Sequence, residues 1–558
     1  AFDVSNACAG MFTGMLVVDS FLTAGNIRRC LVVSGEYTSG IIGTAQQEIT
    51  EYLDLRLASL TVGDAGAAVL LESSGKTGAG FHELDMYTLG KYSRMCIGQI
   101  TDGPHGGAII MRPDPIEHTA IAVRHSAANL KYLFDTYDRA PESIDHLIMH
   151  QTSAVSLLDG SRAINKCFGK EISTARNTIN NLAHRGNTAS TSHMVAVWDH
   201  IQNGRIKSGD KTVFSITGSG QTIGTATYTF DDLPDRLRSI TKTGKKPEKH
   251  MAEHTMQTAA HRNFARVQIS ATGLFPDNQT RPDDTVETAA CAARTCLAKS
   301  AYEPCDIDLL IFAGVTRTNH VFEPAIASMV AEKLNINDSI DSETDRKTLA
   351  FDVFNGAMSF MNGCHIASEM IYAGKFRTAM VVASEVETNK LHFPDRLLGL
   401  AETGGAVILD SSPSGQVGFS PFIFHYDLEH FEAREVIGRY VEGKLCMCLQ
   451  ENEHLRELYL QTIQAAVNDL LAREGLTMSQ VTHLIPPQIS PESNYRLARH
   501  LGIVSRRVID RAVTGQDLYT SGMAHSLEYL RKQDLSKTGD IGLIIQVSSG
   551  IQAGCVAY

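Results

Sequence analysis

Short apolar runs alternate along the chain with longer amphipathic stretches. Runs such as 29–34 and 67–71 are mostly aliphatic, which is typical of strands buried on both faces of a sheet. Stretches with helical periodicity lie between them, for example 11–24 and 118–136. The alternation predicts α/β domains in which helices pack against layered sheets.

The same pattern of segments occurs twice. Residues 2–14 return, with substitutions, as residues 351–363, and the order of later segments is kept in both copies. The further pairs are 31–36 with 380–385, 66–72 with 404–410, 146–153 with 483–490, and 220–224 with 550–554. A repeat of this length predicts two duplicated domains rather than a solenoid of short units.

A polar segment separates the two copies. We expect a first domain at 1–230, a linker at 231–264 that is charged and lacks apolar periodicity, and a second domain at 265–558. The second copy carries residues 265–349 before its repeated segment, whereas the first copy begins at that segment. We therefore expect the first domain to lack its N-terminal portion, either because the sequence is a fragment or because another polypeptide supplies it.

Composition excludes several classes of protein. A chain of 558 residues with 43% hydrophobic and 20% charged residues is ordinary globular material for several domains. The net charge of −12 argues against nucleic-acid binding. The sequence contains no run of eighteen apolar residues, so we expect no membrane span. The eleven cysteines show no metal-ligand spacing, so we expect reduced thiols, no metal site and a cytoplasmic protein, with a signal peptide left open.

Cys8 is the first candidate for chemistry. It lies between the expected strand 2–4 and the amphipathic run from residue 11, with Ala7, Ala9 and Gly10 as small neighbours. A cysteine that enters a helix N-terminus is stabilised as a thiolate by the helix dipole, and small neighbours allow a substrate to approach. The alternative is a buried, inert cysteine.

Three further sites follow in the first copy. His150 follows the apolar run 147–149, where strand ends gather functional groups, although a structural histidine is the alternative. Asn187 lies in a turn before an expected helix, where it is either functional or a cap. The turn Gly218-Ser219-Gly220 offers backbone amides for an oxyanion, or is simply a tight turn.

The repeat favours the functional interpretation, because three polar candidates are replaced together in the second copy. The pairs are Cys8 with Ala357, His150 with Pro487 and, across a small gap, Asn187 with Gln516. Their joint loss predicts that Cys8, His150 and Asn187 form one unit in the first copy.

These residues resemble the Cys-His-Asn triad of the 3-ketoacyl-ACP synthase III family in the thiolase superfamily. The segments 5–10, 150–153 and 184–190 carry the resemblance, and 63–69 and 203–210 match further family stretches in order. The resemblance is strong over 1–230 and weaker over 265–558. It implies the thiolase fold, an α/β architecture with αβαβα layers, and an internal pseudo-dimer of an active and an inactive copy, or a homo-oligomer.

The resemblance also implies a reaction. Cys8 would be acylated from acyl-CoA or acyl carrier protein, without a cofactor, and His150 with Asn187 would bind the carbonyl of a malonyl thioester to favour decarboxylation. The backbone amides of Cys8 and Ser219 would form the oxyanion hole. The residues expected to bind substrate are Arg56, Ser153 and Gly218.

Three functions remain open at this point. Decarboxylative condensation is favoured because Asn187 is retained, since decarboxylation needs this second donor. Thr152, Ser153 and Ser219 depart from the family pattern, which suggests a specialised acyl donor or a non-malonyl acceptor and hence specialised lipid or polyketide synthesis. Acyl transfer from Cys8 to an oxygen or nitrogen acceptor is the alternative. A non-catalytic scaffold fits the second copy but not the first, which keeps its three candidates.

Overall fold

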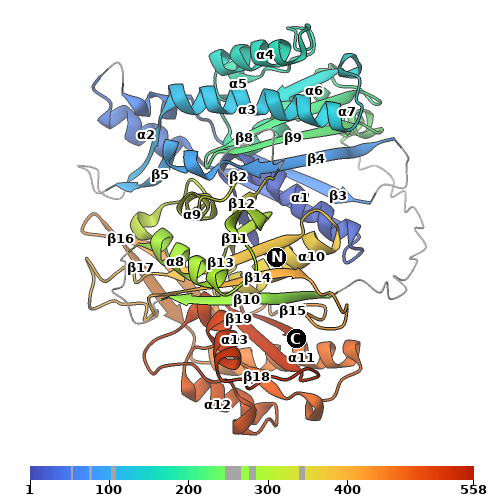
Figure 1. The fold of residues 1–558 in the computed structure, drawn as a ribbon. Coiled ribbons are helices and arrows are strands. Elements are labelled where there is room, and N and C mark those ends of the chain that lie inside the picture. Colours follow the sequence, from blue (N-terminus) through green and yellow to red (C-terminus); the bar gives the residue numbers. More distant parts are fainter. Residues whose placement is uncertain (52–53, 74–77, 102–107, 245–265, 276–283, 338–345) are drawn as a thin grey trace.

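The computed structural model describes the whole chain except residues 52–53, 74–77, 102–107, 245–265, 276–283 and 338–345 (Figure 1). The described residues form a mixed α/β protein. No helix among them is long and apolar enough to cross a bilayer.

The second half shows five layers. Its first sheet has the order β12-β11-β13-β14-β10, with α8 and α9 on one face and α10 and α13 on the other. A second sheet, β15-β20-β19-β18, packs on the inner helices and is covered outside by α11 and α12. The bounds are β10 Val267–Phe275, α8 Thr285–Ala298, β11 Leu309–Phe312, α9 Ile326–Leu334, β12 Leu349–Phe354, α10 Ser359–Tyr372, β13 Thr378–Glu385, β14 Thr403–Ser411, β15 Ile423–Tyr426, α11 Leu455–Glu474, β18 His483–Ile485, α12 Pro491–His500, α13 Gly522–Lys532, β19 Gly542–Ser548 and β20 Gln552–Ala557.

The first half repeats part of this arrangement. The sheet β4-β9-β8-β7 corresponds to the second sheet of the other half, and α3 and α4 lie over it. A two-stranded sheet, β2-β3, corresponds to β13-β14, and α1 packs against it. The bounds are α1 Gly10–Thr23, β2 Arg29–Glu36, α2 Ser39–Glu48, β3 Ala65–Glu72, β4 Gly80–Thr88, β5 Cys96–Thr101, β6 Ala108–Pro113, α3 Pro115–Thr136, β7 His146–Met149, α4 Ala154–Phe168, α5 Leu182–Arg185, α6 Ser192–Gln202, β8 Lys211–Gly218 and β9 Thr222–Thr229.

Equivalent strands join the two halves. Strand β1 (Asp3–Ser5) extends the first sheet of the second half by pairing antiparallel with β12, and Val4 lies opposite Val353. These two valines occupy the same position of the repeat, so the junction has local two-fold symmetry. One hydrophobic core continues across it, with Phe12 and Phe214 from the first half and Phe360 from the second. The halves therefore fold against each other.

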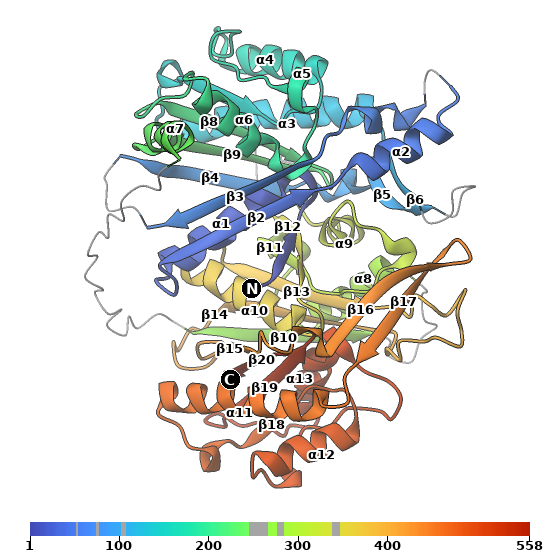
Figure 2. The same ribbon diagram turned by 180° about the vertical axis from the view of Figure 1, so that it is seen from behind.

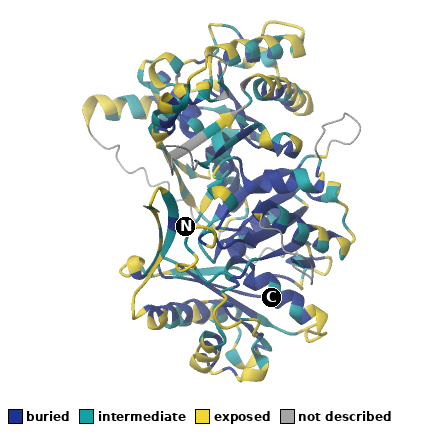
Figure 3. Cartoon of the chain, turned by 90° about the vertical axis from the view of Figure 1, so that its left-hand side faces the viewer, coloured by how far each residue is buried: buried dark blue, intermediate teal, exposed yellow. Residues whose placement is uncertain are grey.

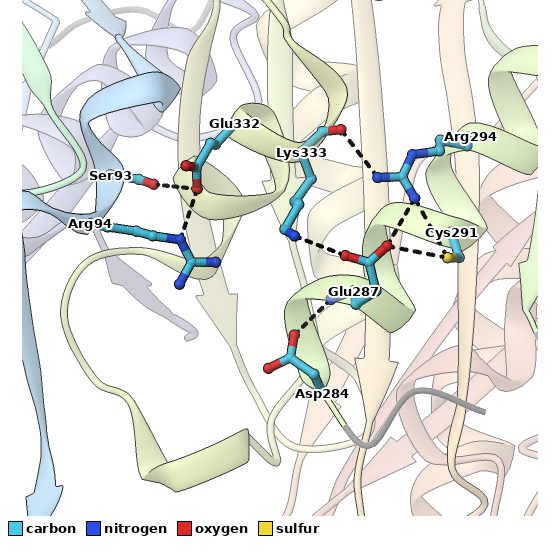
Figure 4. Close-up of polar contacts among 8 residues, drawn as sticks. All are labelled: Ser93, Arg94, Asp284, Glu287, Cys291, Arg294, Glu332 and Lys333. Carbon is cyan, nitrogen blue, oxygen red and sulfur yellow. Dashed lines mark hydrogen bonds and ion pairs between the residues drawn. The ribbon is translucent and has the colours of Figure 1, made fainter. Parts of the chain in front are cut away.

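A second contact between the halves lies beside helix α9. The short helix η3 (Gly90–Met95) approaches so closely that a Cβ on Gly90 would lie 2.7 Å from the backbone nitrogen of Glu332. Ser93 Oγ and Arg94 Nε each donate to Glu332 at 3.1 Å (Figure 4). Glycine at position 90 permits this packing because any side chain would collide with the helix backbone.

The expected strands 29–34 and 67–71 are present as β2 and β3, but they are buried on one face only. Residues Leu31, Val33 and Leu70 are 59%, 65% and 62% exposed, whereas β13 is buried along its whole length. Figure 2 shows β2 and β3 side by side, and Figure 3 colours the chain by burial. In the second half, the equivalent strands β13 and β14 are enclosed by β10, β11, α8 and α9. No described segment of the first half takes the corresponding positions around β2 and β3. The prediction of two buried faces was therefore wrong for this sheet.

The segment 231–264 is not uniformly irregular where it is described. Residues Leu233–Thr243 form helix α7, and Leu233 and Leu237 pack on the core. Arg238 Nη1 donates to the carbonyls of Ile201 and Ile206 beside α6, at 3.1 and 2.9 Å. The charged surface of α7 hid its two anchoring leucines from the sequence analysis, and the part of the linker from residue 245 lies outside the described residues.

Candidate active site

Cys8 lies in a one-turn 3₁₀ helix, η1 (Ala7–Ala9), between β1 and α1. Ala7 has a left-handed φ of 46°, which turns the chain sharply before the helix begins. The buried side chain of Asn6 fixes the turn, since its Nδ2 donates to Thr13 Oγ1 and its Oδ1 accepts from Thr222 Oγ1, both at 3.0 Å. The position of Cys8 is therefore set by two polar anchors.

The turn after β8 packs directly on the Cys8 turn. A Cβ on Gly218 would lie 2.8 Å from the backbone nitrogen of Ala9, so this position requires glycine. The missing side chain of Gly218 lets the segment that carries Ser219 approach the cysteine turn.

The environment of Cys8 does not favour a thiolate. Burial raises the pKa of the Cys8 thiol well above its ordinary value, and the carboxyl groups of Glu323 and Glu36 raise it further. The expectation that the helix dipole would lower this pKa was wrong, because desolvation and two nearby carboxyl groups outweigh the dipole. Cys8 is therefore a protonated thiol near neutral pH.

Glu323 reaches this site from the second half. Its carboxyl group accepts a hydrogen bond from Ser219 Oγ, and its backbone carbonyl accepts one from Gly98 N at 2.8 Å. Burial raises the pKa of Glu323 above its ordinary value. No sequence pattern predicts a role for Glu323, because only the folded arrangement brings residue 323 next to residue 8.

We expect Glu323→Gln to increase the reactivity of Cys8. Loss of the carboxyl group lowers the pKa of the thiol, so at pH 8.5 the rate of Cys8 alkylation by iodoacetamide should rise about three- to ten-fold. Peptide mass spectrometry separates Cys8 from the other cysteines, and exposed Cys167 provides the internal control. An unchanged or slower Cys8 rate would contradict the electrostatic assignment.

His150 is a buried, neutral imidazole. It follows β7, and its backbone nitrogen donates to Ser215 O on β8 at 3.1 Å. Burial lowers its pKa to about 3, helped by His193 and His118, and neither ring nitrogen has a partner among the described residues. His193 stacks on it with ring centroids 5.8 Å apart. A buried ring that carries one unused N–H can donate it to a ligand.

Asn187 is held with its amide nitrogen free. Its Oδ1 accepts from Ala189 N at 3.0 Å, and its backbone pairs with Thr61 and Gly63 at 2.8 and 2.9 Å. Nδ2 has no hydrogen-bond partner within the described part of the chain. This arrangement leaves Asn187 as a second fixed N–H donor.

The three segments converge. The turn η1 that carries Cys8 contacts β8 and the 3₁₀ turn η5 (Ala189–Thr191), which begins two residues after Asn187. His193, which stacks on His150, also lies edge-on to Phe12 of α1, at 5.1 Å between ring centroids. Ser190 N donates to Glu36 at 3.1 Å, which ties η5 to the end of β2. His193 and Glu36 belong to this site but were missed in the sequence, where neither lies in a distinctive pattern.

The two other predicted substrate residues have partners within the protein. Ser153 is exposed and caps α4, accepting from Ser156 N at 3.0 Å. Arg56 is bound to Asp54 and Glu48, both at 2.6 Å, and its hydrogen bonds lower the pKa of Asp54 to about 2. Either residue would have to exchange these partners to bind a substrate.

The second half confirms two of the three replacements and corrects the third. Asp517, not Gln516, is the counterpart of Asn187: it accepts from Tyr519 N as Asn187 accepts from Ala189 N, and it pairs with Leu400 as Asn187 pairs with Val62. The gap before residue 516 was placed wrongly in the sequence comparison. The second half therefore carries Ala357, Pro487 and Asp517, and burial raises the pKa of Asp517.

We expect Ala357→Cys to create no second active site. Pro487 has no side-chain donor, and Asp517 offers a carboxyl group where the first half offers an amide. In a Cys8→Ala background, incubation with acyl thioesters should give no product. Acylation at residue 357 together with turnover would refute the assignment of the donors, and the parent protein with Cys8 intact serves as the positive control.

Family models match three stretches of the chain. The family model for 3-oxoacyl-[acyl-carrier-protein (ACP)] synthase III matches residues 2–90 and 351–427, and the model for its C-terminal part matches residues 135–230. The chain is therefore similar to the 3-oxoacyl-ACP synthase III family in both halves. The matches at 2–90 and 351–427 fall on the two tandem copies.

Relatives cover about half of this synthase III-like chain. The β-ketoacyl-ACP synthase III of Acholeplasma laidlawii is 23% identical over 281 residues, which is 50% of this chain and 84% of the relative. That of Rhizorhabdus wittichii is 26% identical over 296 residues, or 52% and 88%. Among solved structures, synthase III from Pseudomonas aeruginosa is 18% identical and covers 52% of this chain and 97% of its own, with a TM-score of 0.45. A structure of Xanthomonas campestris OleA is 17% identical, covers 53% and 98%, and has a TM-score of 0.44.

Proposed function

We propose that the first half is a working condensing domain, residues 1–230, and that residues 265–558 form an inactive copy paired with it as an internal pseudo-dimer. The observation that carries the proposal is the pair of unused N–H donors, on His150 and Asn187, in the half that carries Cys8. The equivalents in the other half are proline and aspartate. Relatives named as β-ketoacyl-ACP synthase III support this reaction class.

In the first step the acyl group moves to Cys8. The Cys8 sulfur attacks the carbonyl carbon of an acyl-CoA or acyl-ACP thioester, and the carrier thiol leaves. The proton of Cys8 ends on the departing sulfur, so the transfer needs no net base and is compatible with a raised thiol pKa. Backbone amides of Cys8 and Ser219 stabilise the tetrahedral oxyanion.

In the second step a malonyl thioester loses carbon dioxide. His150 and Asn187 donate to its thioester carbonyl and stabilise the enolate that remains. The enolate carbon attacks the acyl carbon on Cys8, a carbon–carbon bond forms as the bond to the Cys8 sulfur breaks, and the departing thiolate takes a proton from solvent. No cofactor takes part, and within the described residues no cluster of His, Cys, Asp or Glu is arranged to hold a metal ion.

The second half contributes to this site by position. Glu323 shapes the electrostatics of Cys8, and the β1–β12 junction fixes the segment before it. We propose further that a polypeptide segment covers the exposed face of β2 and β3, as α8 covers β13 and β14. This segment belongs either to a longer form of the chain or to a separate chain.

Arg56, Ser153 and Gly218 complete the proposal as substrate contacts. Arg56 would meet the CoA nucleotide by exchanging Asp54 or Glu48 for phosphate, and Ser153 lies at the exposed start of α4. All eleven cysteines are free thiols, which suits a reducing compartment such as the cytoplasm.

Mass spectrometry tests the proposal directly. We expect incubation with a panel of acyl thioesters to add one acyl mass to Cys8, and subsequent malonyl thioester to release carbon dioxide as the acyl mass disappears. Loss of the acyl group to an amine or alcohol without carbon dioxide would identify an acyltransferase instead. Absence of any acyl mass across the panel would contradict catalysis at Cys8.

A further inference from the structure

The second half contains a cavity of about 330 Å³ beside the β1–β12 junction. Most of its wall is apolar and comes from the loop 315–322, the segment 398–400 and the hairpin of β16 (Arg434–Val441) and β17 (Lys444–Glu451). Val436, Met447 and Leu449 face the cavity from the hairpin. A volume of this size lies at the lower end of the range of ligand pockets, and its lining suits an aliphatic group.

Two polar atoms in this apolar wall have no partner among the described residues. The side chain of Arg317 is buried, with Nη2 donating to Asp352 at 2.7 Å and Nη1 to Val321 O at 3.2 Å, yet its Nε has no acceptor. Thr388 Oγ1 is likewise buried without a partner. Buried polar groups are almost always paired, so each of these donors fits an acceptor oxygen of a ligand.

The charges around the cavity are balanced. Arg317 is paired with Asp352, and Arg434 lies 3.4 Å from Glu451 and 3.9 Å from Asp517. The cavity therefore has no excess cation that would demand an anion. A neutral carbonyl oxygen on an aliphatic chain satisfies both the lining and the unused donors.

A second hollow, of about 240 Å³, adjoins the first at Leu400 and is lined mostly by polar residues. Gly399, Gly515 and Gln516 border it, next to the position of Asp517. An aliphatic group in the first cavity can thus continue into a polar attachment in the second.

We propose that the second half holds an acyl group without reacting with it, in the cavity between the β16–β17 hairpin and the β1–β12 junction. The site lacks a nucleophile, since Ala357 replaces the cysteine, so binding is non-covalent. It does not depend on the chemistry proposed for Cys8. The bound acyl chain packs on Val436 and Leu449, and its carbonyl oxygen accepts from Thr388 or Arg317.

A photoreactive N-methyl octanamide, with a diazirine at the chain end, tests this site in the full chain. An amide cannot acylate Cys8, so labelling reports binding alone. Irradiation followed by peptide mass spectrometry should place label in residues 434–451 or 315–322, and unlabelled octanamide should compete. Label confined to peptides of the first half, or label that unlabelled amide does not displace, would overturn the proposal.

Three variants sharpen the test. Val436→Trp fills the cavity and should reduce hairpin labelling about ten-fold or more. Arg439→Trp places the same side chain on the opposite face of the same strand and should leave labelling within about two-fold, because alternate residues of a strand face opposite sides. Thr388→Val removes one donor at nearly constant volume and should weaken labelling about two- to ten-fold. Equal labelling in Val436→Trp and the parent would refute the site.

The outcome is separable from that of the proposed condensation. Cys8→Ala should leave hairpin labelling unchanged, because the cavity lies in the other half. Failure of Cys8 to take up acyl groups would count against the condensing activity only, whereas unaltered labelling in the Val436→Trp protein would count against this cavity only.

Discussion

Replacing Cys8 with alanine is expected to abolish the acyl-enzyme. Cys8 is the cysteine of the η1 turn, whereas the neighbouring thiol of Cys96 donates to Glu323 at 3.9 Å from strand β5 and is held protonated by burial, which raises its pKa. We expect acyl uptake from thioesters to fall by about 10³-fold or more, as is usual when a nucleophile is removed. Intact-mass spectrometry after brief incubation with an acyl thioester measures the effect.

Cys167 provides the matched control for this prediction. It is an exposed cysteine at the end of α4, and Cys167→Ala should retain the full acyl mass. A circular dichroism spectrum equal to that of the parent would show that the Cys8 variant is folded. Persistent acylation in folded Cys8→Ala would show that a different residue is the nucleophile.

His150→Ala is expected to separate the two partial reactions. Acylation of Cys8 should continue, because His150 is not needed to take up its proton, while release of carbon dioxide from malonyl thioester should fall about 10²- to 10³-fold. The reason is the loss of one of two fixed donors to the developing enolate. Because burial holds the pKa of His150 at about 3, the parent reaction should show no titration of this residue between pH 5 and 9.

Two comparisons make the His150 result interpretable. His82→Ala changes an exposed histidine of the same half, bonded only to Thr229, and should leave both steps intact. An equal loss of acylation and decarboxylation in His150→Ala would contradict the division of roles. A pH profile with an inflection near 6.5 that His150→Ala removes would contradict its neutral state.

The repeat was the most informative part of the sequence. It placed Cys8 opposite Ala357 and His150 opposite Pro487 without any knowledge of the fold, because the segments around them align without a gap in both copies. The helices at 11–24 and 118–136 were also predicted to within a few residues, as α1 and α3. Continuous apolar periodicity determines such elements locally.

Features that depend on contacts between distant segments were not predictable. The counterpart of Asn187 is Asp517, because the side chain of each accepts a hydrogen bond from the backbone amide two residues later. The sequence comparison assigned Gln516 instead, because the loop before it differs in length between the copies. Glu323 acts on a cysteine that precedes it by most of the chain. The thiol pKa was predicted in the wrong direction because the sequence shows the helix start but not the surrounding carboxyl groups.

The prediction that β2 is buried on both faces and the prediction that residues 233–243 are an irregular linker were wrong for different reasons. An aliphatic strand is more stable when other elements pack on both of its faces, but its sequence does not show that such elements are present. On one face of β2, Leu31 and Val33 remain exposed. Helix α7 looks like a solvated linker because only Leu233 and Leu237 anchor it. Both cases show that composition reports the preference of a segment, whereas its neighbours decide the result.

The pairing of Val4 with Val353 has a consequence for inheritance. If two copies of a single gene product formed this junction, both partners would be identical in every assembly. A covalent tandem keeps one cysteine-bearing half and one alanine-bearing half in every chain, in a ratio of one to one. A substitution in β1 or in β12 therefore changes one side of the junction and leaves the other side as it was.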